Sequence, residues 1–173
     1  NNIYLKIDEI IVKNISENNN LEIYAEMMKD TKVTNSLSKD HSKNDLNLLR
    51  LNIIKYKGAL LGICKIEDEN TPFGTIGISN IDYRNLNFNI GISIHASYRS
   101  CGYAYKAIKG IINYFQIKTN FKLIWLCVNE DNIAAIQLYY KLGFMSQEIS
   151  KEFFKKKMYN PKKEKFMTFS FKR

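Results

Sequence analysis

The chain has 173 residues, of which 45% are hydrophobic, 13% aromatic and 25% charged. This composition fits one globular domain (residues 1–173) with a core of its own, and it excludes a disordered, collagen-like or linker-dominated chain. The formal net charge of +9 would permit a polyanion as a partner, but only four of the basic residues are arginines and the lysines are spread along the chain.

Neither a membrane anchor nor an export signal is expected. No apolar run approaches the ~18 residues that a membrane-spanning helix needs. The N-terminus has no basic segment followed by an apolar one. The three cysteines, Cys64, Cys101 and Cys127, lie too far apart for a zinc site. We therefore expect reduced thiols in a cytoplasmic protein, and no metal.

The first half of the chain mixes β-branched runs with segments of helical spacing. The β-branched and alternating stretches predict strands over residues 3–12, 59–67, 73–81 and 88–94. Apolar residues at helical spacing predict helices over residues 18–30 and 39–50.

The second half alternates more clearly between helix and strand. Apolar residues from Ala104 to Phe115 recur at i, i+3, i+4, i+7, i+8 and i+11, which is one face of a helix of about four turns. A buried strand is predicted over 122–128, a helix over 131–142, and two closing strands from 144 and over 165–171. The whole pattern predicts an α/β (α+β) domain with a mixed sheet flanked by helices.

A loop with small residues joins the strand over 88–94 to the long helix. It contains Arg99, Gly102 and Ala104 at the point where the helix begins. Backbone N–H groups at a helix N-terminus lack intrahelical partners, and with the helix dipole they attract anions. An arginine beside them would add charge-assisted hydrogen bonds to a phosphate. On the loop alone, an ordinary strand–helix turn is the more common explanation.

A second motif covers residues 132–144, which read Asn-x-x-Ala-x-x-Leu-Tyr-x-Lys-x-Gly-Phe. This segment resembles the corresponding motif of the GNAT superfamily of acyl-CoA-dependent N-acetyltransferases at each named position. The loop at 99–104 is similar to the pyrophosphate loop of that family, Gln/Arg-x-x-Gly-x-Gly/Ala. Both motifs occur in the order of the family, with a helix and a strand between them. Residues 73–82 are similar to the matching segment in one branch of the family, the branch that includes ribosomal-protein N-terminal acetyltransferases and spermidine acetyltransferases.

The resemblance implies the GNAT fold, with a mostly antiparallel sheet of about six or seven strands that splays near Ile94. It also implies acetyl-CoA as co-substrate and a primary amine as acceptor. Tyr139 corresponds to the family tyrosine that protonates the leaving thiolate, which makes it the candidate general acid. The implied cofactor-binding residues are Ile92, Ser93 and Ile94 in the strand, Arg99, Ser100, Cys101, Gly102, Tyr103, Ala104 and Tyr105 in the loop and first turn, and Asn132, Tyr139 and Lys141 in the second motif.

Three departures from the family pattern concern the acceptor and the chemistry. Cys101 stands where the family loop usually has a basic or polar residue. The strand before the loop has Asn87 and Asn89 where a carboxylate often serves as general base, and Asp82 is the nearest carboxylate in sequence. The acidic, aromatic segment that polyamine acetyltransferases carry after their first helix is absent, which argues against a polyamine acceptor.

Several alternatives stay open at this stage. The acceptor could be a small amine, a protein N-terminus, an aminoglycoside-type drug or an amino sugar, and the domain could instead bind acetyl-CoA as a non-catalytic sensor. A homodimer is left open. We expect no specific nucleic acid or membrane partner, and we interpret the lysines at 155–157 and 162–165 as a solvated connection. Structural roles are expected for His95, Trp125, Cys64 and Cys127, and an exposed position for His41.

Overall fold

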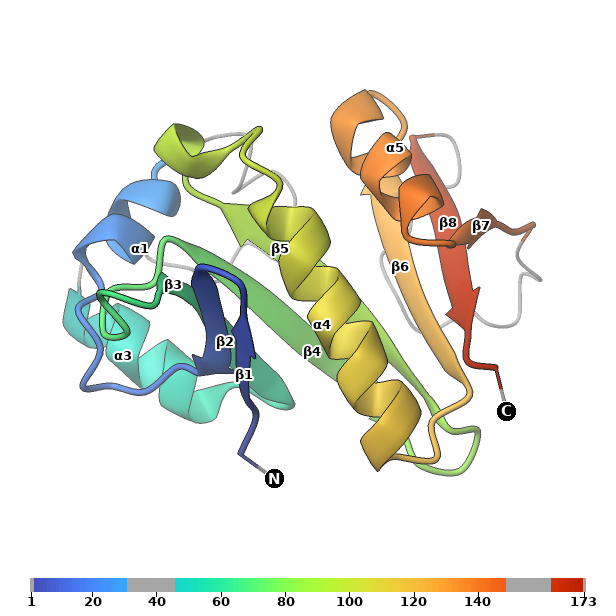
Figure 1. The fold of residues 1–173 in the computed structure, drawn as a ribbon, viewed down its shortest axis with the longest axis horizontal. Coiled ribbons are helices and arrows are strands. Elements are labelled where there is room, and N and C mark those ends of the chain that lie inside the picture. The colour runs from blue at the N-terminus through green and yellow to red at the C-terminus, as the bar shows by residue number, and fades with distance from the viewer. Residues whose placement is uncertain (1, 31–45, 149–162, 173) are drawn as a thin grey trace.

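The computed structural model describes residues 2–30, 46–148 and 163–172. Within these residues, eight strands form one sheet in the order β1-β2-β3-β4-β5-β6-β8-β7 (Figure 1). All neighbouring strands are antiparallel except β5 and β6, which are parallel. The strands are β1 (Tyr4–Ile7), β2 (Ile10–Asn14), β3 (Ala59–Lys65), β4 (Gly74–Asp82), β5 (Asn87–Ile94), β6 (Leu123–Asn129), β7 (Met145–Ser146) and β8 (Glu164–Ser170).

Helices cover both faces of this sheet. On one face, α4 (Tyr103–Lys118) and α5 (Ile133–Lys141) pack on the main core. On the other face, α1 (Glu22–Met27) and α3 (Leu46–Lys55) form a second, smaller core into which Leu60 of β3 packs. Because side chains alternate along a strand, Leu61 points the opposite way and joins the main core. None of the helices in the described part of the chain is long and apolar enough to cross a membrane.

The N-terminal segment differs from its prediction. The sequence predicts one strand over 3–12, and this is wrong: the segment is a hairpin in which Tyr4 of β1 lies opposite Lys13 of β2. The chain reverses at Asp8, whose φ of 50° lies in the left-handed region that aspartate tolerates better than most residues. Only two polar residues, Asp8 and Glu9, separate the apolar residues on either side, and neither is glycine or proline, so the sequence carries no strong turn signal here.

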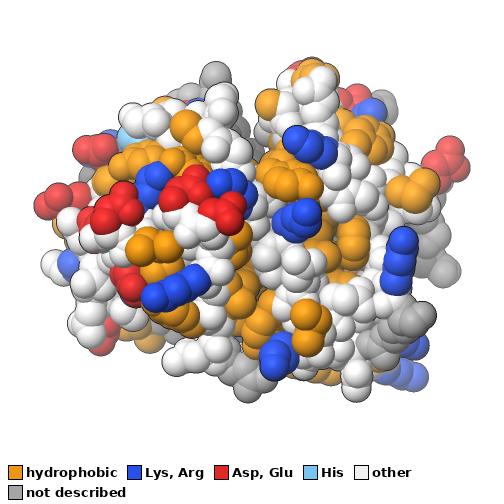
Figure 2. All heavy atoms as spheres, viewed as in Figure 1, with side chains coloured by type: hydrophobic (Ala, Val, Ile, Leu, Met, Phe, Trp, Pro, Cys, Tyr) orange, Lys and Arg blue, Asp and Glu red, His pale blue; other side chains and the backbone are white. Residues whose placement is uncertain are grey.

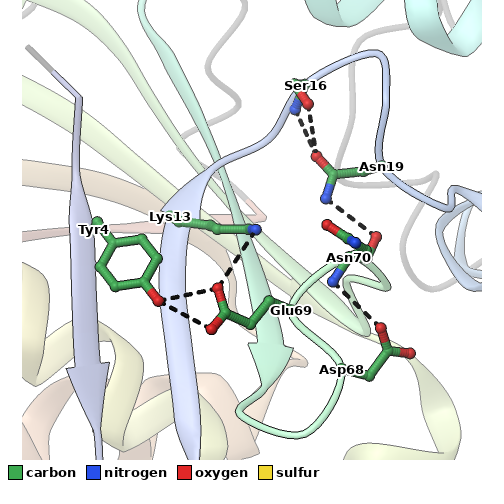
Figure 3. Close-up of polar contacts among 7 residues, drawn as sticks. All are labelled: Tyr4, Lys13, Ser16, Asn19, Asp68, Glu69 and Asn70. Carbon is green, nitrogen blue, oxygen red and sulfur yellow. Dashed lines mark hydrogen bonds and ion pairs between the residues drawn. The ribbon is translucent and has the colours of Figure 1, made fainter.

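A cluster of polar contacts anchors the hairpin to the connection between β3 and β4 (Figure 3). The Tyr4 hydroxyl donates to the Glu69 carboxylate at 3.0 Å, and the Lys13 ammonium lies 3.9 Å from the same carboxylate. The Asn19 side chain donates to the backbone carbonyl of Asn70 at 3.1 Å. These contacts join residues some 50 to 65 positions apart in the sequence and hold the edge of the sheet in place.

The other predicted elements are found with shifted ends. The long amphipathic helix is confirmed as α4, and its apolar face from Ala107 to Phe115 is buried in the main core. The second predicted helix is described over Leu46–Lys55, so it continues beyond its predicted end at residue 50. Residues 39–45, like His41 and the lysines at 155–157, lie outside the described residues. Cys64 and Trp125 are buried as expected, whereas Cys127 is only half-buried.

Candidate functional site

The candidate site begins where strands β5 and β6 separate. They pair at only three positions, from Asn87 with Leu123 to Asn89 with Trp125. Beyond Asn89, β5 continues to Ile94 with no backbone pairing to β6, so the sheet opens into a V. Figure 2 shows the same opening as a notch at the top edge of the molecule, between the start of α4 and α5.

Two asparagines close the narrow end of this V. The Asn89 side-chain amide donates to the backbone carbonyl of Trp125 at 3.2 Å, in the place where the strand ladder stops. The Trp125 indole N–H donates to the Asn87 Oδ1 atom at 3.2 Å. The Asn89 Oδ1 atom accepts from the Ser79 hydroxyl at 3.2 Å. These two asparagines, which stand where the family often has a general-base carboxylate, therefore hold the two halves of the sheet together.

The open edge of β5 offers backbone hydrogen-bonding groups. His95 N–H donates to the Phe73 carbonyl at 2.9 Å, and bonded positions alternate along an antiparallel pair. Ser93 and Gly91 therefore bond to β4, whereas the N–H and C=O groups of Ile92 point toward the opening. Of the three strand residues predicted to bind the cofactor, Ile92 presents its backbone to the opening, Ser93 does not, and the Ile94 carbonyl already accepts from Arg99 Nε at 2.9 Å.

The start of α4 lies at the mouth of the opening. Gly102 precedes the helix with a φ of 79°, and a Cβ atom added there would have no described atom within 4 Å. The first intrahelical bond runs from Lys106 N–H to the Gly102 carbonyl. The N–H groups of Tyr103, Ala104 and Tyr105 consequently have no partner within the helix. A 16-residue helix with an exposed glycine at its N-terminus is a favourable place for a phosphate group.

The side chains of this loop and first turn point in different directions. Ser100 and Cys101 are exposed, and Ala104 is half-buried against the main core. Tyr103 points into the fold, because its ring packs 5.1 Å from the ring of Phe73 and its hydroxyl accepts from the Lys65 ammonium. An anion bound at this loop would therefore contact backbone N–H groups more than side chains.

Arg99 is held by an ion pair that the sequence alone does not indicate. Its guanidinium lies 2.6 Å from the Asp30 carboxylate, and its Nε donates to the Ile94 carbonyl. Nearby, the Nδ1 atom of His95 accepts from the backbone of the following turn, and its Nε2 lies 3.4 Å from the Glu26 carboxylate. Both side chains tie the loop after β5 to the α1 segment, and a phosphate would meet Arg99 alongside Asp30.

The second motif lies on α5, on the other side of the opening. Asn132 caps this helix, since its Oδ1 atom accepts from Ala135 N–H at 3.2 Å. Its side-chain amide N–H₂ remains as a donor. The Lys141 ammonium lies 4.9 Å from the centre of the Tyr105 ring, which brings the first turn of α4 and the end of α5 together. The two sequence motifs are thus neighbours in space.

Tyr139 is one of the buried residues of the second motif. Its side chain is 6% exposed and its ring lies 5.4 Å from that of Phe144. Burial raises the pKa of the Tyr139 hydroxyl to about 12, so the group is protonated at neutral pH. Burial is the sole cause of this rise, and no hydrogen bond to another of the described residues contributes to it. A buried, protonated hydroxyl without a partner is suited to donate to a ligand atom.

The comparisons with known proteins agree with this geometry. A family model for the acetyltransferase (GNAT) domain matches residues 10–145. The chain belongs to the GNAT acetyltransferase family. No curated protein matches the chain.

Solved GNAT structures share this fold. An acetyltransferase (GNAT family) from Bacillus anthracis is 17% identical, with a TM-score of 0.76, and the match covers 97% of this chain and 98% of that one. Ribosomal-protein-S5-alanine acetyltransferase from Vibrio fischeri is 13% identical, with a TM-score of 0.78 and coverages of 98% and 97%. Spermidine N-acetyltransferase from Vibrio cholerae, solved with CoA and spermine, is 18% identical, with a TM-score of 0.73 and coverages of 94% and 96%.

Sequence reasoning missed residues that act through tertiary contacts. Asp30 lies 69 positions from Arg99, and nothing local in the sequence couples the two. Tyr56, just after α3, is a second example: an added Cβ atom at Gly77 of β4 would lie 2.5 Å from its hydroxyl oxygen. Neither position has a motif around it, so only the fold reveals them.

Proposed function

We propose that this GNAT protein transfers the acetyl group of acetyl-CoA to a primary amine. The observation that carries the proposal is the V between β5 and β6, with a free helix N-terminus at its mouth and, across the opening, helix α5, which carries the buried Tyr139. A backbone edge suits the amide-bearing arm of CoA, as an added strand would. The Vibrio cholerae relative of the same fold holds CoA, which supports the assignment.

The chain has groups for each end of such a ligand. The N–H groups at the start of α4 would bind the pyrophosphate, and Gly102 leaves room for a close approach because a side chain there would take up the space. Ile92 would bond the amide-bearing arm through its backbone. Asn132 would donate from its side-chain amide, and Lys141 would add positive charge beside Tyr105.

Transfer forms a bond between the amine nitrogen and the acetyl carbon and breaks the bond between that carbon and sulfur. An alkylamine with a pKa of ~10.4 must lose a proton to water before it attacks, and its nitrogen gives a second proton to water as the amide forms. The chain would hold amine and thioester in contact and use backbone N–H groups to stabilise the developing oxyanion. Tyr139 would then give its phenolic proton to the leaving thiolate.

The test is direct transfer by the purified protein. Acetyl-CoA is mixed with an alanine-initiated peptide, spermidine or kanamycin, CoA release is followed with a thiol reagent, and the acetylated amine is identified by mass spectrometry. Acetyl-CoA binding by calorimetry together with one acetylated amine supports the proposal. Binding without any thioester cleavage would favour the non-catalytic sensor instead, and no binding would refute both.

A further inference from the structure

Gly91 is a glycine that the fold itself does not require. At each of the other seven of the eight glycines, either φ is positive or a heavy atom lies within 3.1 Å of where a Cβ atom would be. Gly91 has an ordinary strand conformation, and no described atom lies within 4 Å of its would-be Cβ. A glycine inside a strand weakens the strand, and it often marks a place where a ligand approaches the backbone closely.

Small, uncharged residues surround Gly91 on the face of the sheet opposite α4. Gly91 lies directly across from Gly77 of β4, so two neighbouring strands both lack a side chain at this point. Since side chains alternate, the flanking positions on the same face are the pairs Ser79 with Asn89 and Thr75 with Ser93.

Tyr56 borders this group of small residues on the side of Gly77. Its hydroxyl fills the space above Gly77, whereas none of the described residues fills the neighbouring space above Gly91, which is exposed. Burial raises the pKa of the Tyr56 hydroxyl, and a hydrogen bond with the Ser79 side chain offsets part of this rise. The hydroxyl is therefore protonated at neutral pH and can exchange a hydrogen bond with a neighbouring amine but cannot act as a base.

This open space adjoins the proposed thioester site. Ile92, the next residue, points its backbone groups into the V, while the face above Gly91 is reached from the α3 side of the sheet. We infer that the space above Gly91 receives the acceptor amine, and that Gly91 is a specificity-determining position that admits an unhindered primary amine. The inference rests on the proposed function and names the acceptor side of the same site.

The test compares Gly91→Ala and Gly91→Val with the wild-type protein on whichever amine of the panel above is acetylated. A methyl group in this space would displace the amine, and a displacement of about 1 Å can cost ~10²-fold in rate. We expect kcat/KM for the amine to fall strongly in Gly91→Ala and further in Gly91→Val. Acetyl-CoA affinity should be unchanged, and slow hydrolysis of acetyl-CoA should persist because water still fits. Ser170→Thr, which adds one carbon at an exposed strand position beyond the closed end of the V, is the matched control.

Each outcome separates this inference from the proposed function. Because alanine suits a strand at least as well as glycine, Gly91→Ala should not lower the free energy of unfolding. Full amine acetylation by both variants would overturn the inference and leave the proposed function standing. Weaker acetyl-CoA binding in Gly91→Ala would also overturn it, since the position would then belong to the cofactor arm. A wild-type protein that binds acetyl-CoA and acetylates no amine would overturn both.

Discussion

Replacing Tyr139 by phenylalanine should separate catalysis from stability. The ring and its packing against Phe144 remain, and the hydroxyl that is lost has no hydrogen-bond partner among the described residues. A bonded hydroxyl inside a fold contributes about 1 kcal/mol, so we expect no such loss in the free energy of unfolding of Tyr139→Phe. Turnover should fall ~10²-fold or more, because a general acid contributes that much.

The size of the pKa difference decides whether the proton transfer is feasible. An exposed thiol has a pKa of about 8.5, and a transfer to its thiolate from a tyrosine with a pKa of about 12 would cost ~5 kcal/mol. That cost exceeds the ~2.7 kcal/mol that a hundredfold acceleration represents. Burial, however, raises the pKa of the Cys64 thiol to about 11 in this same protein. A thiolate kept dry beside Tyr139 has a raised pKa for the same reason, which narrows the difference between the two pKa values.

The assay is steady-state turnover at saturating acetyl-CoA, with urea unfolding of the same preparations. Tyr140→Phe is the matched control, since Tyr140 is the next residue and is 47% exposed. Normal turnover in Tyr139→Phe would refute the general-acid role. A loss of stability equal to that of a broken hydrogen bond would show that the hydroxyl has a structural partner instead.

Three further predictions concern the loop, the second motif and acid stability. Gly102→Ala should cost ~1–2 kcal/mol of unfolding free energy because of its φ of 79°, and calorimetry should show weaker acetyl-CoA binding; unchanged affinity in the folded variant would remove the loop from the site. Asn132→Ala should cost about 0.5–2 kcal/mol in urea unfolding, because the cap on Ala135 N–H is lost; an equal stability would contradict the cap. The hydrogen bond from Lys106 lowers the pKa of Glu9 below its ordinary 4.5, so the stabilisation by this carboxylate is complete above pH 4.5 and is lost as the pH falls through the folded-state pKa. Glu9→Gln should accordingly be less stable than wild type at pH 7, with a difference that shrinks in acid; a difference independent of pH would contradict the ion pair.

Local signals in the sequence predict the part of the fold that surrounds the site. The spacing of apolar residues predicts α4, because an amphipathic helix repeats every 3.6 residues whatever it packs against. The motif over 132–144 predicts both α5 and the family. The hairpin at Asp8 is missed, since the chain turns there over only two polar residues, Asp8 and Glu9, without glycine or proline.

Contacts between distant residues account for what sequence reasoning does not reach. Arg99 is expected to meet a phosphate, and the fold in addition pairs it with Asp30. Asn89 looks like a missing carboxylate in the sequence, whereas in the structure its amide closes the end of the V against Trp125. Gly91 has no local signal at all, because its meaning depends on Gly77 across the strand pair and on the Tyr56 hydroxyl beside it.

The central claim is that the opening between β5 and β6 holds acetyl-CoA. A crystal structure of this chain with CoA tests it most directly. We predict the amide-bearing arm along the backbone edge of Ile92, the pyrophosphate on the N–H groups of residues 103–105, and the sulfur within hydrogen-bonding reach of the Tyr139 hydroxyl. CoA bound elsewhere on the protein, with the V empty, would contradict the claim.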